Sequence, residues 1–316
     1  MASPSVIEPS RLPPAAAPKA PGEREGFIET RDGLSLRMRE WGDRDGDPIV
    51  LLHGLRGYSG TWRGLASALG ADWRLIAIDQ RGRGESDWDP ACNYYTDAYL
   101  ADLEALADQL GLDRFTLLGH SMGGTTAYAY AARHPDRLDA LIIEDIAPGS
   151  SVSGVGAERI KAEMAALPED FADWGAARAY WHKARPSVGE EALEQRLAES
   201  LRETQDGRVG WRYDAAGISR TRLDPDPARI VDLWPVVEAI RTPAFVIRGG
   251  KSDFCRLDTV LEMERRNSRF THATVPMASH YVHDDAPDIF HALVEGWLAG
   301  VRSGGTAARD QRKNQG

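Results

Sequence analysis

Residues 119–123 read Gly119-His120-Ser121-Met122-Gly123, a G-x-S-x-G pattern between an apolar run at 115–118 and an alanine-rich run at 125–132. The first run is typical of a buried strand and the second of a helix. A serine at such a strand-to-helix turn is typical of a nucleophile elbow, in which a sharp turn exposes the hydroxyl group. The flanking glycines make so sharp a turn sterically possible. Ser121 is therefore the candidate nucleophile.

Length and charge limit the class of protein. The 316 residues are enough for one large domain with an insertion or for two ordinary domains. The formal net charge is -10, and the basic residues are scattered along the sequence. This pattern disfavours a nucleic-acid surface and a polybasic membrane patch. We expect a small-molecule partner, and the sequence leaves the oligomeric state open.

The cysteines and the chain ends indicate the compartment. Cys92 and Cys255 are isolated and form neither a C-x-x-C pair nor a zinc-binding spacing, which fits a reducing compartment without disulfides. Residues 1–25 are rich in proline and alanine and lack the apolar core of a signal peptide, so they predict a disordered tail. The polar segment 301–316 is expected to be equally unstructured. With no run of 18 apolar residues, the sequence predicts a soluble, cytoplasmic protein.

The apolar pattern predicts an α/β core made of residues 26–148 and 236–300. Segments 26–30 and 34–41 alternate apolar and polar residues around Asp32-Gly33, which is typical of an antiparallel hairpin. Short apolar runs typical of buried strands follow at 49–52, 75–78, 115–118, 141–143, 244–247 and 273–275. Most are separated by helical patterns, which predicts a mainly parallel sheet covered on both faces. Ligands bind such sheets at the carboxyl ends of the strands.

Residues 149–235 interrupt the strand pattern and predict a helical cap. Helical patterns occupy 157–167, 174–182 and 190–203. The cap is also rich in aromatic residues, namely Phe171, Trp174, Tyr180, Trp181, Trp211 and Tyr213. Such residues form a cap core or line a pocket. We favour the cap core for most of them and take Trp181 as a candidate substrate contact.

A nucleophilic serine needs a base to accept its proton. Six of the eight histidines lie in glycine turns, in the cap, or within or at the end of a regular element. His280 and His283 remain, just after the last strand pattern and near the start of the final helical pattern. We favour His280, because loops at strand ends carry the catalytic groups of an α/β sheet. A surface histidine pair and a metal site are the alternatives.

The oxyanion formed by attack on a carbonyl needs hydrogen-bond donors. Leu55 follows His53-Gly54 at the end of an early strand pattern and offers a backbone N–H. Met122, directly after the candidate nucleophile, offers a second. Arg56 follows Leu55 and is a candidate partner for a substrate carboxylate, with a salt-bridged surface arginine as the alternative.

Four motifs together resemble the α/β-hydrolase fold family. They are His53-Gly54, the segment Asp79-Gln80-Arg81-Gly82-Arg83-Gly84-Glu85-Ser86, the stretch 119–124 and the loop of His280, and they occur in the family's order and spacing. The resemblance covers residues 26–298. It implies an eight-stranded sheet, a cap over the carboxyl ends of the strands, Ser-acid-His chemistry and no cofactor. It also places the oxyanion donors at Leu55 and Met122.

The family takes its acid from the loop after either of two strands, and both loops here contain an aspartate. Asp145 lies in Glu144-Asp145-Ile146-Ala147-Pro148 and resembles the D-x-x-P pattern of esterase-like members. Asp253 lies three residues after Gly250, close to the commoner family pattern, although the same count from Gly249 ends on Ser252. We favour Asp145 and keep Asp253 as the alternative.

These residues and the resemblance predict a serine hydrolase that acts on a small carboxylic ester, lactone or related acyl compound, without a metal. A C–C bond hydrolase and a cofactor-free perhydrolase are the alternatives on the same fold. A noncatalytic ligand-binding module is a third.

Overall fold

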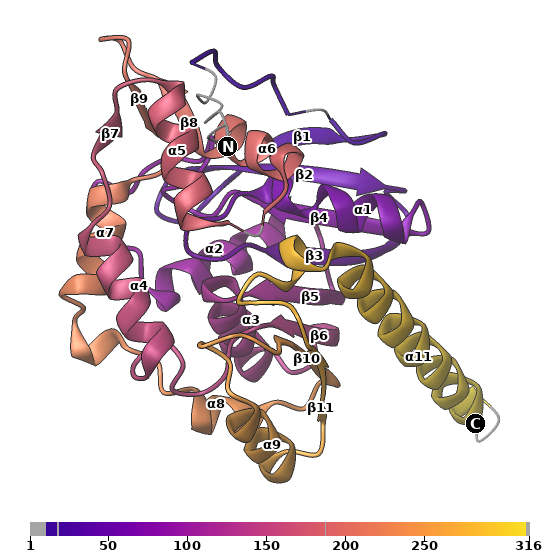
Figure 1. Ribbon diagram of the computed structural model, residues 1–316. Helices are drawn as coiled ribbons and strands as arrows, with labels where there is room; N and C mark the ends of the chain where they lie inside the picture. Colours follow the sequence, from indigo (N-terminus) through magenta and orange to yellow (C-terminus); the bar gives the residue numbers. More distant parts are fainter. Residues whose placement is uncertain (1–10, 18, 187, 314–316) are drawn as a thin grey trace, which may run out of the picture.

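The computed structural model describes residues 11–17, 19–186 and 188–313, and its main feature is an eight-stranded sheet with the order β1-β2-β4-β3-β5-β6-β10-β11 (Figure 1). The first two strands form an antiparallel hairpin, β2 also pairs with β4 antiparallel, and β4, β3, β5, β6, β10 and β11 run parallel to one another. The strands are β1 Arg24–Glu29, β2 Ser35–Gly42, β3 Asp47–Leu52, β4 Trp73–Ile78, β5 Phe115–His120, β6 Leu138–Glu144, β10 Ala244–Gly249 and β11 Phe270–Val275. The predicted α/β-hydrolase fold is confirmed.

Each face of the sheet carries its own hydrophobic core, because successive strand residues point to opposite faces. In β3, Val50 and Leu52 pack into one core, and Ile49 and Leu51 into the other. The first core is covered by α2 Thr96–Gln109, α3 Met122–Arg133, α8 Leu233–Ala239 and α9 Leu257–Arg266. The second is covered by α1 Arg63–Leu69 and α11 Pro287–Lys313. The central strands are therefore buried on both sides.

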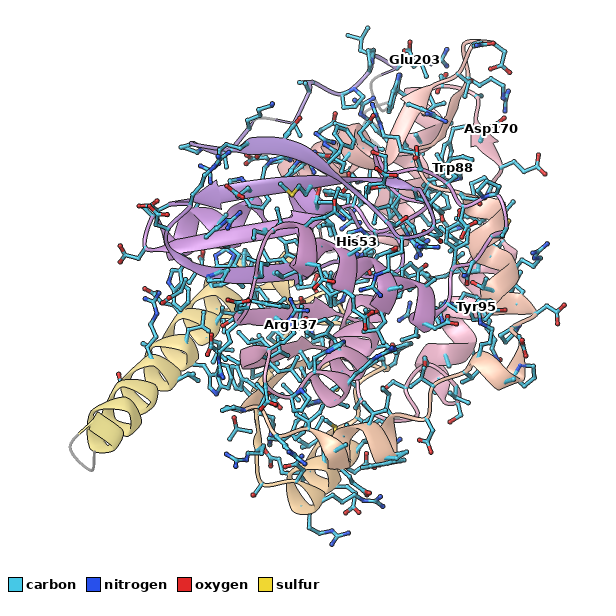
Figure 2. All side chains as sticks on the ribbon, turned by 180° about the vertical axis from the view of Figure 1, so that it is seen from behind. His53, Trp88, Tyr95, Arg137, Asp170 and Glu203 are labelled. Carbon is cyan, nitrogen blue, oxygen red and sulfur yellow. The ribbon has the colours of Figure 1, made fainter. Side chains whose placement is uncertain are left out.

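The cap contains helices and a small antiparallel sheet in the order β7-β9-β8. Its elements are α4 Val155–Ala165, β7 Asp170–Phe171, α5 Trp174–Ala184, α6 Glu190–Ser200, β8 Leu201–Glu203, β9 Val209–Trp211 and α7 Ala215–Leu223. Residues 201–203, expected at the end of a helix, instead pair with β9. Figure 2 shows Asp170 and Glu203 of this sheet at the edge of the molecule and His53 deep in its body.

Helix α8, Leu233–Ala239, contains residue 235, the expected boundary between cap and core. Helix α8 begins at Leu233, and the side chains of Leu233 and Val237 are buried in the core beneath the sheet. The short 3-10 helix η2, Pro227–Arg229, precedes it. Residue 235 thus lies within a helix that packs on the core.

Parts of both terminal segments, which were expected to be unstructured, have defined contacts or secondary structure in the described residues. Residues 1–10 and 18 of the predicted N-terminal tail lie outside the described residues. Glu23 is bound by Arg63 and Trp41, so the end of this tail is fixed to the core. At the other end α11 continues to Lys313, through the polar segment that was expected to be unstructured. Within the described residues, no helix combines the length and apolar character of a membrane span.

Candidate active site

Ser121 occupies the sharp turn between β5 and α3. Strand β5 ends at His120 and α3 begins at Met122, so Ser121 alone joins the two elements. Its backbone has φ 51° and ψ −114°, a left-handed conformation that non-glycine residues rarely adopt. Such strain is retained at functional sites when the surrounding structure enforces it. The turn holds the hydroxyl group at the carboxyl end of the central strand.

Three glycines allow this turn to pack closely. A Cβ atom on Gly119 would lie 2.4 Å from the carbonyl oxygen of Gly123. A Cβ atom on Gly123 would lie 2.5 Å from the carbonyl oxygen of Leu52, and one on Gly124 would lie 2.5 Å from a methyl group of Ile146. No real side chain tolerates these distances, so the glycine pattern is required by the packing of α3 on β3, β5 and β6.

A chain of hydrogen bonds links Ser121, His280 and Asp145. The Ser121 Oγ lies 2.9 Å from Nε2 of His280, and the Nδ1 of the same ring lies 2.7 Å from Oδ2 of Asp145. All three residues are buried or nearly so. The carboxylate accepts from Nδ1–H, which leaves the Nε2 lone pair free to accept the serine proton. The loop after β11 thus brings His280 to the serine, as the sequence predicts.

Asp145 is held in place by further donors. It follows β6 directly, and its Oδ1 accepts the backbone N–H of Gly249 at 2.7 Å. The hydroxyl group of Ser252 donates to Oδ2. The Ser252 Oγ in turn accepts the N–H groups of Phe254 and Cys255. The carboxylate is therefore fully hydrogen-bonded although it has no exposed surface.

Asp253, the alternative acid, lies in a different contact. Its two carboxylate oxygens accept from Nε and Nη2 of Arg159 in α4, at 2.8 and 2.9 Å. These hydrogen bonds hold the pKa of Asp253 below its ordinary value. Asp145 therefore contacts His280, whereas Asp253 binds the cap helix α4. In the loop after β10 it is Ser252 that contacts Asp145.

The two predicted oxyanion donors, Leu55 and Met122, line the same cavity as Ser121. Among the described residues, the N–H groups of Leu55 and Met122 have no hydrogen-bond acceptor. A Cβ atom on Gly54 would lie 2.6 Å from Nδ1 of His120 and 3.4 Å from Cβ of Ser121, so the loop before Leu55 packs directly on the turn. Both N–H groups are therefore candidates for binding an oxyanion formed at Ser121.

Buried groups fix the loop that carries Leu55. The Nε2 of His53 accepts the N–H of Gln80 at 3.0 Å, and its Nδ1–H donates to the carbonyl of Gly54 at 2.8 Å. Burial lowers the pKa of His53 to about 4, so the ring is neutral at pH 7. Arg83 also donates from Nε to the carbonyl of Leu55 at 3.2 Å. The segment 79–86 therefore acts as a support for the loop.

A cluster of polar side chains that contains His120 and His283 lies next to His280. Among the described residues, His120, Glu144 and His283 have donor atoms within 4.8 Å of one another and could together hold a metal ion. These side chains already form hydrogen bonds within the protein. The Nδ1–H and the backbone N–H of His283 both donate to Glu144, and Nε2–H of His120 donates to the carbonyl of His280 at 2.9 Å. The cluster therefore acts as a support for the His280 loop.

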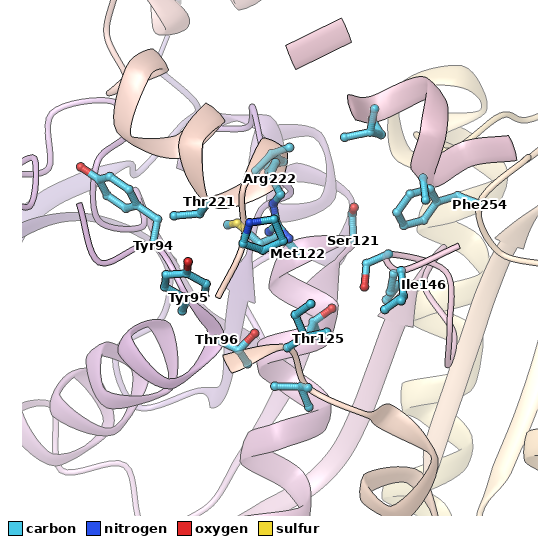
Figure 3. A pocket seen from close by; sticks show the side chains of 18 of the residues that line it. Tyr94, Tyr95, Thr96, Ser121, Met122, Thr125, Ile146, Thr221, Arg222 and Phe254 are labelled. Carbon is cyan, nitrogen blue, oxygen red and sulfur yellow. The ribbon is translucent and has the colours of Figure 1, made fainter. Parts of the chain in front are cut away.

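A cavity of about 160 Å³ opens beside Ser121, between the sheet and the cap (Figure 3). Its walls include the two donor positions, His280 and the side chains labelled in Figure 3, among them Ile146, Arg222 and Phe254. Arg56 also lines it, but its guanidinium forms an ion pair with Glu163 of α4. The substrate carboxylate expected on Arg56 would therefore compete with a protein carboxylate.

Trp181 does not line this cavity, in contrast to its expected role as a substrate contact. It is 2% exposed, and its ring packs edge-on against those of Tyr180 and Trp211. It belongs to the aromatic core of the cap, because α5 turns this face toward the small sheet. The sequence pattern of a helix shows which residues share a face, but not which of two apolar surroundings that face meets.

Two contributors to the site were not predicted. Ser252 donates to Asp145, and the only sequence signal for it was its position three residues after Gly249. Arg222 of α7 lines the cavity, and nothing in its local sequence distinguishes it from the neighbouring Arg220. Its position depends on how the cap packs over the core.

Comparisons with known proteins agree with the fold. A family model described as alpha/beta hydrolase fold matches residues 47–287. The chain is 31% identical over 278 residues to a putative 2-succinyl-6-hydroxy-2,4-cyclohexadiene-1-carboxylate synthase of Bacillus subtilis, covering 87% of this chain and 98% of the relative. It is 33% identical over 263 residues to the sn-1-specific diacylglycerol lipase ABHD11 of Mus musculus, covering 82% of this chain and 83% of the relative.

A solved structure has the same fold. The crystal structure of E-2-(acetamidomethylene)succinate hydrolase superposes with a TM-score of 0.78 at 24% identity, covering 88% of this chain and 99% of the other. The similarity extends over the core and the cap region alike. At this level of identity it shows the fold and no more.

Proposed function

Because the chain belongs to the α/β-hydrolase fold family, we propose that it is a serine hydrolase that cleaves a small carboxylic ester, lactone or related acyl compound. The observation that carries the proposal is the hydrogen-bonded chain from Ser121 through His280 to Asp145. The three residues come from the ends of different strands, and their arrangement matches the roles of nucleophile, base and orienting acid.

In the first step, Ser121 Oγ attacks the carbonyl carbon of the substrate while Nε2 of His280 takes the hydroxyl proton. The resulting imidazolium is stabilised by Asp145, which accepts hydrogen bonds on both oxygens. The Nδ1–H bond also fixes the ring orientation before the substrate arrives. Little reorganisation is then needed at the moment of attack.

The carbonyl oxygen gains negative charge in this step, and the N–H groups of Leu55 and Met122 would bind it. Removing one such donor in a serine hydrolase typically costs about 10²–10³ in turnover. Met122 lies at the first position of α3, so the partial positive charge of the helix N-terminus acts on the same oxygen. His280 then donates its proton to the leaving group, and an acyl-enzyme remains.

Water completes the cycle by the same route. His280 takes a proton from a water molecule, the hydroxide attacks the acyl carbon, and Ser121 leaves with the proton from the imidazolium. The cap covers this space, and the cavity of about 160 Å³ suits a short acyl group. The name of the mouse relative, a lipase, supports ester cleavage as the reaction class.

The direct test is hydrolysis of short p-nitrophenyl esters by the wild-type protein and by Ser121→Ala, with Ser153→Ala, an exposed serine of the cap, as the matched control. We expect turnover by the wild type and the control, and its loss in Ser121→Ala. A screen with lactones, amides and a β-diketone, run in parallel, identifies the bond that is cleaved. An active Ser121→Ala enzyme would refute the proposal.

A further inference from the structure

The cavity beside Ser121 has an unusual charge for this protein. The whole chain carries a formal net charge of -10. Yet the described side chains that line the cavity include Arg56, Lys161, Arg222 and Arg229 and no aspartate or glutamate. Cations that line a cavity with low-dielectric walls attract anions strongly. The question is which of these four cations is available to a ligand.

Three of the four already have carboxylate partners. Arg56 pairs with Glu163, and Arg229 pairs with Asp97. Lys161 pairs with Glu158 at 3.1 Å, near the outer surface of α4. These ion pairs connect the cap to the core or lie along its surface, and each neutralises its own cation. They leave Arg222.

Arg222 has no such partner among the described residues. No carboxylate lies within ion-pair distance of its guanidinium, and its Nε atom is buried without a hydrogen-bond acceptor. Burial and the nearby cation Arg83 lower its pKa from the ordinary value. Arginine still remains charged at pH 7 because its ordinary pKa is above 12. The Arg222 side chain as a whole is half-buried, but a buried Nε–H without an acceptor is costly, and such groups are normally paired or serve a ligand.

Arg83, whose positive charge acts on Arg222, is a second cation in this region. Its guanidinium is fully buried and donates to neutral acceptors, the hydroxyl group of Tyr99 and the carbonyl of Arg81, and contacts the sulfur of Met122 at 3.2 Å. The positive charges of Arg83 and Arg222 thus act on each other, and in the described part of the chain no carboxylate forms an ion pair with either. Because Arg83 contacts Met122, this positive region lies close to Ser121.

A role at the helix end does not account for the position of Arg222. Basic residues in the last turn of a helix interact favourably with its dipole. Arg220, in the same turn of α7, serves this purpose while exposed to water. Arg222 instead lines the cavity, and its buried Nε–H is cut off from water. A ligand with negative charge would replace that hydration.

We propose that Arg222 binds a free carboxylate of the substrate, so that the preferred substrate is an acyl compound that carries a second, ionised carboxyl group. The guanidinium fork matches the two oxygens of a carboxylate. Ile146, Val231 and Phe254 line the same cavity and suit the short aliphatic chain that would join this carboxylate to the reacting carbonyl. This inference rests on the proposed hydrolase function and names its substrate class.

The test compares two esters of equal chain length, p-nitrophenyl hydrogen glutarate and p-nitrophenyl valerate, which differ by a terminal carboxylate. In the wild type we expect kcat/KM to favour the glutarate ester. Arg222→Met should lower kcat/KM for this ester about 10- to 100-fold, the range for a charge-assisted hydrogen bond, and change the valerate ester less than about 3-fold. Arg222→Lys should retain part of the preference. Arg220→Met, the exposed control on the same helix, should match the wild type with both esters.

A binding measurement separates this inference from the proposed reaction. Calorimetric titration of Ser121→Ala with glutarate needs no catalysis, and we expect binding that is lost in Ser121→Ala/Arg222→Met. If glutarate binds in this way but neither ester is cleaved by the wild type, the anion site stands and the proposed hydrolase function fails. If both esters are cleaved and Arg222→Met affects them equally or not at all, the inference is overturned while the proposed function stands. Thermal unfolding of each variant shows that it is folded.

Discussion

Oδ2 of Asp145 lies 2.7 Å from Nδ1 of His280, although 135 residues separate the two in the sequence. Strands β6 and β10 are adjacent in the sheet, and β10 pairs with β11, so the loops after β6 and β11 lie at the same edge. The cap is inserted between these two parts of the core. The order of the strands therefore assembles the site, and the cap covers it.

The first prediction concerns the acid. Asp145→Asn should lower kcat on an ester by about 10⁴, because the amide no longer holds the histidine tautomer that accepts the serine proton. Asp253→Asn, the matched change in the neighbouring loop, should leave kcat within about tenfold of the wild type and act through the contact with Arg159. Steady-state kinetics of the two variants decide between the aspartates. Equal losses in both would contradict the assignment.

The second prediction concerns the close packing of the nucleophile turn. Gly123→Ala should destabilise the protein by about 2 kcal/mol or more, because its Cβ would lie 2.5 Å from the carbonyl oxygen of Leu52. Gly296→Ala is the control, an exposed position in α11 with no atom near the added methyl group. It should stabilise the protein by about 0.5–1 kcal/mol through helix propensity. Urea unfolding measures both, and a neutral Gly123→Ala would show that the turn has room to relax.

The third prediction concerns Arg81 in the segment 79–86. Its buried guanidinium binds Asp102, Asp89 and Asp32. Arg81→Leu leaves Asp102 buried without a cation and should lower the free energy of unfolding by about 3–5 kcal/mol. The exposed pair of Arg114 and Asp139 provides the control, since Arg114→Leu should cost less than about 1 kcal/mol. Similar costs for both would mean that the buried network contributes little.

The fourth prediction concerns pH. The folded-state pKa of His53 is about 4, below the ordinary 6.5, because burial disfavours the charged ring. The unfolded chain therefore binds more protons between these values, and stability is fully present above pH 6.5 and falls as the pH drops toward 4. Over this pH range the titration of His53 should lower the free energy of unfolding by up to about 3 kcal/mol.

His53→Gln tests this contribution, because a glutamine oxygen can accept the Gln80 N–H without titrating. The variant is expected to be less stable at pH 7, but its unfolding free energy should change less between pH 6.5 and 4 than that of the wild type. Urea unfolding across this range gives both slopes. Parallel slopes would exclude His53 as a source of the acid sensitivity.

Much of the fold could be predicted from sequence because it depends on local patterns. Buried strands of a parallel sheet are apolar on both faces, so β3, β5 and β10 appear as short apolar runs. The roles of Ser121 and its flanking glycines depend on the geometry of one turn, so a short sequence motif is enough to predict them. His280 follows from its place after the last strand.

The remaining features depend on contacts between distant segments. Ser252 and Asp253 are adjacent, and only the packing of α4 on this loop determines that Ser252 faces Asp145 and Asp253 faces Arg159. Trp181 and Arg222 both lie on cap helices, and the orientation of each helix over the core determines which one reaches the cavity. No periodicity in a single helix contains that information.

The central claim is that Ser121 is the nucleophile, and covalent labelling tests it most directly. The protein is incubated with a fluorophosphonate, its intact mass is measured, and the modified residue is located by peptide mapping. We expect one adduct per chain on Ser121, none in Ser121→Ala, and much slower labelling in His280→Gln. An unlabelled wild-type protein, or an adduct that persists in Ser121→Ala, would contradict it.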